Sequence, residues 1–336
     1  MLSEGAEHLD VATESLGAYA TLQWVSENAC LIQVQPNTNT NTNSNSNSNS
    51  NNQTKQTVHT TNTETQAALL TCNALVMLWV EHLLASSLPK EPSPKESPPK
   101  WLRQYVPSYT SLLLEYDLEY IDSFALRSIL KRAATNIDPK ALVLFDKDAS
   151  KQAPSLSKNA SHHVIEVCYD PQLSHALPDT QRPNDLDAVS QYTKLTSKEI
   201  ISLHSEREYR VFSVGFLPNF AYMGLTSSAL NMPRLASARK AVPAGAVAIA
   251  DNQTAIYPQQ SPGGWHILGY TPEPLFFLND QANKKAQSHI EFASGDTVRF
   301  VSISLEQYLA KYSLYTASES DTSSVNHIDP KLTSDA

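Results

Sequence analysis

Glycine is concentrated in one part of this chain, and its placement constrains the fold more than any other feature. The 336 residues include nine glycines, and seven of these lie between Gly215 and Gly295. Glycine destabilises the interior of a helix, whereas tight turns between short strands require it. The sequence from Tyr209 onward is therefore predicted to be all-β, and closing its strands into a barrel would remove exposed strand edges.

The strands of this barrel are expected where short apolar runs are separated by turn residues. The candidate strands are 209–216, 247–250, 254–257, 265–268 and 297–303. Two short helices are expected just before them. Asn184 is suited to cap the first, and the second begins at Thr196, since Thr196 and Glu199 have the spacing of a capping box.

The first half of the chain mixes helix and strand patterns. Strands are expected at 29–34, 109–116 and 164–169, and helices at 65–85 and 121–134. The predicted fold class is α+β, with a small α+β N-terminal domain over residues 1–163 and a β-barrel domain over 164–310. Segments 37–63, 88–100 and 147–163 are expected to be disordered insertions and 311–336 a disordered tail, because they are polar or proline-rich. The clearest case is 37–51, where Asn alternates strictly with Thr or Ser.

The charge balance excludes one class of partner. Lys and Arg number 25 and Asp and Glu 34, a net charge of −9, whereas a nucleic-acid-binding protein needs a basic surface to neutralise phosphates. No run of about 20 apolar residues is present to span a bilayer, and the first residues are acidic where a signal peptide would be basic. We expect a cytoplasmic protein that contacts neither nucleic acid nor membrane.

Several common catalytic patterns are missing from the sequence. There is no Walker A motif, no GxGxxG and no GxSxG elbow. The three cysteines, Cys30, Cys72 and Cys168, have neither zinc-site nor disulfide spacing and are expected to be buried hydrophobic residues. The adjacent His162 and His163 fall in a predicted polar insertion, where solvation is favoured over metal binding. No metal site is expected.

Arginines and rigid loops indicate where a ligand could bind. Arg207, Arg210, Arg234 and Arg239 are four of nine arginines and lie within 33 residues, among Pro/Gly-rich stretches. Proline fixes the backbone, glycine permits close approach of a ligand, and the guanidinium fork fits a carboxylate or phosphate. Each of these loops could instead have a purely structural role, and Trp265 is expected to be a core residue. His204 ends a helix, so C-terminal capping and acid/base work are both open.

The same region resembles a known family, that of the 5-oxoprolinase B subunit, also called allophanate hydrolase subunit 1 or the kinase-inhibitor-like carboxyltransferase domain. The matching segments are Leu203-His204-Ser205, Glu208-Tyr209-Arg210-Val211, Gly215-Phe216-Leu217-Pro218, Val242-Pro243-Ala244-Gly245, Gln253-Thr254, Ile256-Tyr257-Pro258 and Ser261-Pro262-Gly263-Gly264-Trp265. Seven segments in the same order make the resemblance specific. It covers 164–303 strongly and the first half weakly, and it implies that the barrel is cyclophilin-like.

The resemblance also implies an activity and its partners. Such proteins act with the C and A subunits of 5-oxoprolinase to hydrolyse 5-oxoproline to glutamate, with ATP and its Mg²⁺ as co-substrate. The catalytic residues would then be His204, Arg210 and Arg234. The substrate- or nucleotide-binding residues would be Phe216, Pro218, Tyr222, Arg239, Pro243, Gly245, Gln253, Tyr257, Pro258, Gly263, Gly264 and Trp265. The alternative is a regulatory protein that binds and inhibits a histidine kinase. A peptidyl-prolyl isomerase rests on fold analogy alone.

Three positions depart from the family pattern in ways that matter for the site. Asn219 replaces a glycine, and asparagine tolerates left-handed backbone geometry. Ala255 also replaces a glycine, which would be strained if φ were positive there. Tyr270 stands where an arginine usually precedes Thr-Pro, and this removes a possible anion contact.

Overall fold

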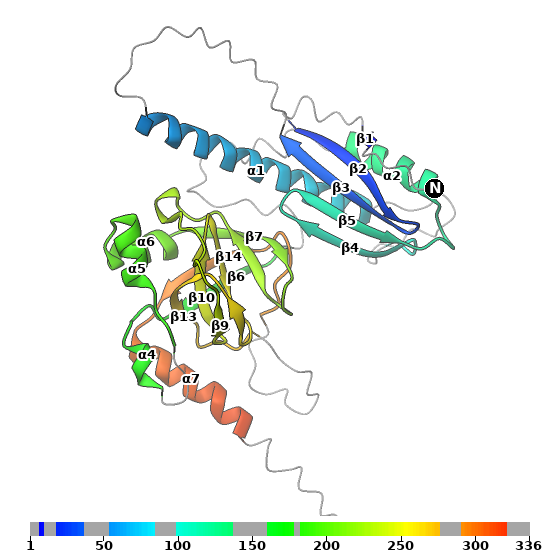
Figure 1. The fold of residues 1–336 in the computed structure, drawn as a ribbon. Helices are drawn as coiled ribbons and strands as arrows, with labels where there is room; N and C mark the ends of the chain where they lie inside the picture. The colour runs from blue at the N-terminus through cyan, green and yellow to red at the C-terminus, as the bar shows by residue number, and fades with distance from the viewer. Residues whose placement is uncertain are drawn as a thin grey trace, which may run out of the picture.

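The described part of the chain is built around two large β-sheets, of five and seven strands (Figure 1). The computed structural model describes residues 7–9, 18–36, 54–84, 99–136, 160–177, 182–275 and 290–320. The protein thus has a mixed helix and strand architecture, as the sequence predicts.

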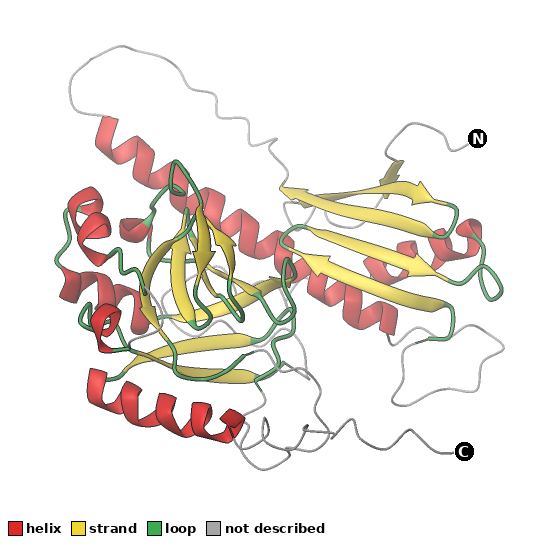
Figure 2. Ribbon diagram, turned by 60° about the horizontal axis from the view of Figure 1, so that its bottom comes forward, coloured by secondary structure: helices red, strands yellow, loops and turns green. Residues whose placement is uncertain are grey.

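The first sheet has five antiparallel strands with helices on one face. Its order is β1 (Glu7–Leu9), β2 (Ala18–Ser26), β3 (Ala29–Pro36), β5 (Ser111–Tyr116) and β4 (Leu102–Ser108). Alternate residues of β2, β3 and β5 are buried, as in a sheet with one covered face. The covering helices are α1 (Thr54–Leu84) and α2 (Ser123–Thr135), whose buried side chains join those of the sheet in one core (Figure 2).

The second sheet has seven strands and almost closes into a barrel. Its order is β13 (His266–Tyr270), β10 (Ala246–Ala250), β11 (Gln253–Ile256), β8 (Ala221–Gly224), β7 (Glu208–Val214), β14 (Thr297–Ser302) and β6 (His162–Val167). All neighbours are antiparallel except β14 and β6. Directly after β6, Cys168 exchanges two backbone hydrogen bonds of 2.8 and 2.9 Å with Tyr270 of β13. The two edges of the sheet therefore meet.

Both faces of the barrel sheet are buried. Along β10, Val247 and Ile249 belong to one cluster of buried side chains, and Ala246, Ala248 and Ala250 to another. Helices α5 (Leu186–Thr193) and α6 (Ser197–Ser205) contribute to the first cluster, and helix α7 (Leu305–Ser320) to the second. Burial on both sides explains why these strands are continuous apolar runs.

Smaller elements complete the described chain. Strands β9 (Arg239–Val242) and β12 (Ser261–Gly263) form a two-stranded sheet, and α4 (Leu173–Ala176) and the 3-10 helix η2 (Ser228–Leu230) are single turns. The halves of the chain touch where the rings of Tyr109 and Phe212 lie 4.9 Å apart. Within the described residues, no helix is long and apolar enough to cross a membrane.

The predicted barrel strands are confirmed within a few residues, but parts of the expected disorder are wrong. Residues 311–320 were expected in a disordered tail and instead continue α7, where Tyr308 is fully buried and Tyr312 packs beside it. Residues 54–63, expected in an insertion, form the start of α1. Residues 162–163 begin β6, because the ladder with β14 extends to His162. The expected insertions at 37–53, 88–98 and 147–159 and the tail after 320 lie outside the described residues, and the domain boundary stays a prediction.

The capping box at the start of α6 is confirmed and gives a direct test of local stability. The hydroxyl of Thr196 accepts from the Glu199 amide at 3.3 Å, and the Glu199 carboxylate accepts from the Thr196 amide at 2.8 Å. Thr196→Ala should lower the free energy of unfolding by about 1 kcal/mol, because a helix amide loses its acceptor. Urea denaturation measures this, with Thr196→Ser as the matched control. Equal stability of the two variants would contradict the assignment.

Candidate functional site

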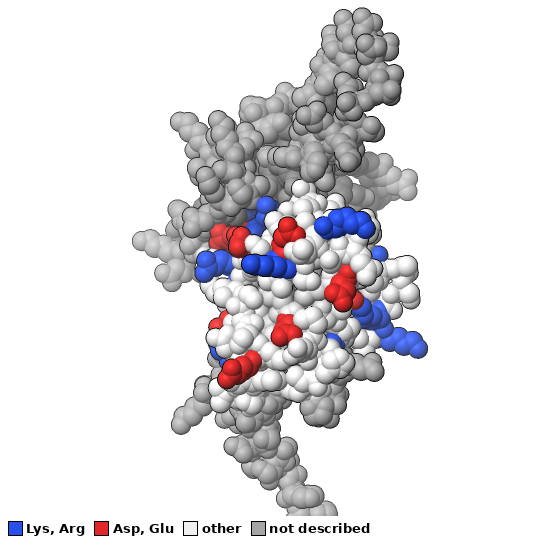
Figure 3. Space-filling view, turned by 90° about the vertical axis from the view of Figure 1, so that its left-hand side faces the viewer, with Lys and Arg blue, Asp and Glu red and all other residues white. Residues whose placement is uncertain are grey.

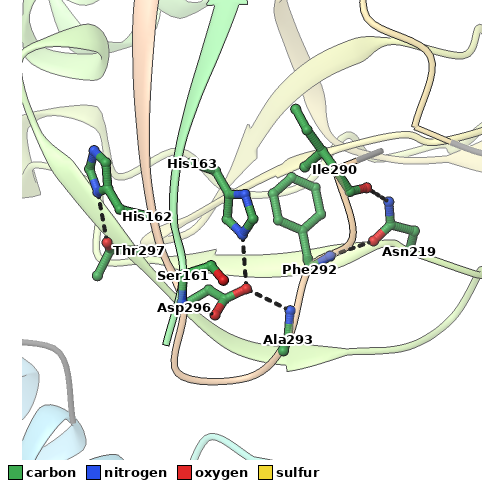
Figure 4. Close-up of polar contacts among 9 residues, drawn as sticks. All are labelled: Ser161, His162, His163, Asn219, Ile290, Phe292, Ala293, Asp296 and Thr297. Atoms are coloured by element: carbon green, nitrogen blue, oxygen red, sulfur yellow. Dashed lines mark hydrogen bonds and ion pairs between the residues drawn. The ribbon is translucent and has the colours of Figure 1, made fainter. Parts of the chain in front are cut away.

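The loop between β7 and β8 is fixed by an unusual backbone and by one asparagine. Phe216 and Asn219 have positive φ values of 74° and 61°. The Asn219 side-chain amide donates to the carbonyls of Leu275 and Ile290 at 2.8 and 2.7 Å, and its oxygen accepts from the amide of Phe292 at 2.8 Å. Figure 4 shows the bonds to Ile290 and Phe292. Asn219 thus ties this loop to the chain on both sides of residues 276–289. The left-handed geometry expected at Asn219 is confirmed.

The loop presents aromatic side chains to a larger group, which we call the aromatic–arginine cluster. Its members are Tyr109, Phe216, Phe220, Tyr222, Arg234, Tyr257 and Trp265. Phe220 is its centre, with ring centroids 4.9 Å from Tyr222, 5.3 Å from Tyr257 and 6.3 Å from Trp265. The guanidinium of Arg234 lies 5.9 Å from the ring of Trp265, within range of a cation–π contact.

Tyr109 brings the first half of the chain into the cluster. Burial raises its pKa, the neighbouring Tyr222 raises it further, and Arg234 lowers it. The Tyr109 hydroxyl is buried and has no hydrogen-bond partner among the described residues. Burial also raises the pKa of Tyr257 to about 12, so these phenols are neutral hydrogen-bond donors at pH 7. The cluster therefore combines one cation with neutral donors and flat apolar rings.

The four arginines that sequence analysis grouped together have different environments. Arg234 is exposed and has no carboxylate partner in the part of the chain that the structure describes. Arg239 is paired with Asp185 at 2.6 Å and donates to the carbonyl of Trp265 at 3.2 Å. Arg207 donates to the carbonyl of Leu225 at 3.1 Å. Arg210 is 1% exposed, and burial, opposed by nearby Glu208, lowers its pKa to about 10. Of these four arginines, Arg234 is the one that is exposed.

Charge elsewhere is mixed. On the face shown in Figure 3, basic and acidic side chains are interspersed among many uncharged residues. That face offers no continuous basic patch of the kind that nucleic acids need.

His204 lies in the core of the barrel. Its Nδ1 is 2.8 Å from the hydroxyl of Tyr169 and its Nε2 is 2.9 Å from the hydroxyl of Thr254. Thr254 donates its own proton to the carbonyl of Ala248 at 3.1 Å, so it accepts from Nε2–H, and Nδ1 accepts from Tyr169. Burial lowers the pKa of His204 to about 3. The imidazole is therefore neutral and fully hydrogen-bonded, and this placement does not support its predicted acid/base role.

Of the histidine pair 162–163, His162 is exposed as expected, whereas His163 is largely buried. The side chain of His163 is 13% exposed and its Nε2 lies 2.9 Å from the carboxylate of Asp296 (Figure 4). Asp296 also accepts from the amides of Ser161 and Ala293. Burial raises the pKa of Asp296, but these hydrogen bonds outweigh it and lower the pKa overall. His163 thus helps to hold the loop before β14.

The remaining predicted site residues lie in several places. Gly263 lies against the cluster, because a Cβ there would overlap the hydroxyl of Tyr257. Gly264 lies between Gly263 and Trp265 in the sequence. Pro218 is exposed in the β7–β8 loop and Gln253 begins β11. Three other residues, Pro243, Gly245 and Pro258, line a separate pocket beside α7.

The structure accommodates the other two departures from the family pattern. Ala255 is a fully buried residue in β11, paired with Ala248, and it is not among the residues with positive φ. Tyr270 receives the guanidinium of Arg182 over its ring at 5.2 Å. A cation therefore reaches this place from another part of the chain. Sequence reasoning assigned none of Arg182, Tyr109 and Phe220 to the site, although Tyr109 lies in a segment of weak family resemblance and Phe220 lies close to a strong one.

The matched pair Asn219→Ala and Asn219→Gly separates the two roles of Asn219. Alanine loses three hydrogen bonds and is strained at positive φ, so it should lower the free energy of unfolding by about 2–3 kcal/mol. Glycine loses the same bonds without strain and should cost about 1 kcal/mol less than alanine. Urea denaturation measures both. If both variants are as stable as the wild type, the loop does not depend on this side chain.

His204 gives stability a defined pH dependence. Below about pH 6.5, the pKa of histidine in an unfolded chain, the unfolded state binds a proton that the folded state excludes. The contribution of the neutral His204 to the free energy of unfolding is therefore complete above pH 6.5. It is lost as the pH falls toward 3, by up to about 1.4 kcal/mol per pH unit. Denaturant midpoints between about pH 4.5 and 6.5 measure the slope. His204→Gln keeps a donor and an acceptor but does not titrate, and an unchanged slope in it would disprove the assignment.

Comparisons with known proteins agree with the motifs. A model of the carboxyltransferase domain, subdomain C and D, matches residues 91–286. The 5-oxoprolinase B subunit of Bacillus subtilis is 29% identical over 233 residues, which is 69% of this chain and 85% of that protein. The 5-oxoprolinase B subunit of Haemophilus influenzae is 41% identical over 121 residues, which is 36% of this chain and 54% of that protein.

Among solved structures, the crystal structure of TTHA0988 is 28% identical, with a TM-score of 0.49. That match covers 69% of this chain and 37% of the TTHA0988 chain, so this chain spans only about a third of that protein. The family model, by contrast, covers more than half of the present sequence. The resemblance to the B subunit of 5-oxoprolinase is thereby confirmed, and the chain belongs to the family of the carboxyltransferase domain, subdomain C and D.

Proposed function

We propose that this chain is one subunit of an ATP-dependent enzyme that opens the cyclic amide 5-oxoproline. The relatives named as the B subunit of 5-oxoprolinase support the activity. The observation that carries the assignment to a site is Arg234, which is exposed, lies beside Trp265 in the aromatic–arginine cluster and has no carboxylate partner among the described residues.

The proposed chemistry explains why ATP is needed. An unstrained lactam carbonyl resists attack by water. Transfer of the γ-phosphoryl group of ATP to the lactam oxygen releases ADP and makes the ring carbon electrophilic. Water then adds to this carbon, the C–N bond breaks, and the hydroxyl proton moves to the nitrogen. Hydrolysis of the resulting acyl phosphate gives glutamate and phosphate.

The cluster supplies binding and electrostatic stabilisation for this reaction. Arg234 offsets negative charge on the phosphoryl group or on the substrate carboxylate. Such electrostatic stabilisation is a main contribution of a protein to phosphoryl transfer. Tyr222 and Tyr257 are neutral donors at the same place, and Trp265 provides a flat apolar wall. Arg239 and Arg210 act by holding the fold, because their charges are already buried or paired.

The rest of the active site would come from a second protein of the complex. The sequence has no Walker A loop, and the described residues contain no group of three or more His, Cys, Asp or Glu that could hold a metal ion. We therefore assign no residue of this chain to Mg²⁺. The proposed partners are the C and A subunits of 5-oxoprolinase, of which the former would complete the site next to the cluster.

Reconstitution tests the proposal. The isolated chain should show no 5-oxoproline-dependent ATP hydrolysis and should gain it when the C and A subunits are added. In the complex, Arg234→Gln should lower kcat/KM by about 10- to 100-fold, the effect of losing a hydrogen bond to a charged group. Lys240→Gln, at an exposed residue of β9, is the control.

Two results would count against the proposal. Normal turnover by the Arg234→Gln complex would remove the cluster from the active site, and turnover by the isolated chain would remove the need for a partner. Inhibition of a histidine kinase by a chain that never supports ATP hydrolysis would favour the regulatory alternative instead.

A further inference from the structure

A pocket beside α7 lies apart from the aromatic–arginine cluster. It has a volume of about 380 Å³, within the range of small-molecule sites. Its walls are the β9–β10 turn, the residues after β13 and one face of α7. The wall is tightly built: Gly245 has φ of +78°, and a Cβ there would lie 2.6 Å from the carbonyl oxygen of Thr271.

Arg182 is the cation of this pocket. It is 5% exposed, and its guanidinium lies between two rings, 5.2 Å from the centroid of Tyr270 and 5.1 Å from that of Tyr312. Its Nε and Nη1 have no hydrogen-bond partner among the described residues. A buried charge with unused donors is costly unless an anion meets it. The rings hold the guanidinium in place without using those donors.

Two further groups in the pocket also lack a hydrogen-bond partner in the part of the chain that the structure describes. The hydroxyl of Tyr308 is fully buried, and Oε2 of Glu273 is buried as well. Burial raises the pKa of Tyr308 to about 12, so this phenol is a neutral donor. Glu273 faces the same space as Arg182, but the two form no ion pair. The pocket thus presents an acceptor and a cation that do not satisfy each other.

We propose that this pocket binds a small carboxylate that carries its own N–H donor, as a free amino acid or a cyclic amide acid does. The carboxylate meets Arg182 and Tyr308, and the N–H group meets Glu273. One ligand of this class satisfies all three groups at once. Arg182 and α7 lie outside the family motifs, whereas Pro243, Gly245 and Pro258 of the pocket wall lie within them. The proposal rests on Arg182, Tyr308 and Glu273, and it can be tested without the proposed enzymatic activity.

Binding to the isolated full-length chain tests this without ATP or partners. The probes are the twenty L-amino acids and 5-oxoproline, screened by ligand-observed NMR at about 10 mM, a concentration that detects even millimolar affinity. The best binder is then titrated beside its analogue without nitrogen and its analogue with the carboxylate converted to an amide. Both analogues should bind at least about tenfold more weakly, because each loses a hydrogen bond to a charged group. If an amino acid binds best, the group that contacts Glu273 is an ammonium. If 5-oxoproline binds best, that group is an amide N–H.

Variants locate the binding. Arg182→Gln should weaken it at least about tenfold and Tyr308→Phe about three- to tenfold, while Arg299→Gln, an exposed arginine on β14, should leave it unchanged. If Arg182→Gln does not fold, Tyr308→Phe and Glu273→Gln test the location of the site. Glu273→Gln should bind the best binder and its analogue without nitrogen with similar affinity. The proposal is overturned if no probe binds the wild type, or if the folded pocket variants bind as the wild type does.

Discussion

The two backbone hydrogen bonds between Cys168 and Tyr270 are the constraint on which the second half of the structure depends. They join the end of the parallel strand β6 to β13, the opposite edge of the seven-stranded sheet. Without them both edges would present unpaired amides and carbonyls, which favour association with other chains. Gly269 permits the approach, because a Cβ there would overlap the carbonyl oxygen of Cys168. Closure of the barrel therefore rests on backbone proximity, and the thiol of Cys168 is only a buried neighbour.

Closure also shapes the pocket beside α7. Tyr270 closes the barrel with its backbone, donates its hydroxyl to the carbonyl of Pro183 at 2.8 Å, and places its ring against Arg182. The next residue, Thr271, donates its amide to Gly245 and so forms the pocket wall. The tyrosine that replaces a family arginine therefore does not leave the place uncharged. The ring of Tyr270 makes a cation–π contact with Arg182, so aromatic rings and not a carboxylate stabilise this charge.

Much of the fold could be predicted, because burial on both faces makes the central strands apolar and the turns between them need glycine. The strands missed were those without such runs, including β4 (with Pro107) and β9 (Arg-Lys-Ala-Val). The site was harder. Motifs placed Tyr257 and Trp265 together, but Tyr109 enters from a different sheet and Arg182 from a loop before α5, and no local pattern reports such contacts. The end of helix α7, residues 311–320, was mistaken for a tail because its polar composition hides Tyr312, whose ring packs beside that of the buried Tyr308.

The arginines show why residue type alone could not assign the site. Arg210, Arg234 and Arg239 have the same chemistry, yet one is buried in the fold, one is exposed, and one is paired with Asp185. A guanidinium paired with a carboxylate, as at Arg239, stabilises the fold, and using it for a ligand would first cost the loss of its partner. A cation next to rings but without a carboxylate, as at Arg234 and Arg182, can take an anion with no such loss. The availability of the charge, and not its presence in a motif, therefore separates the candidate binding residues from those that hold the fold.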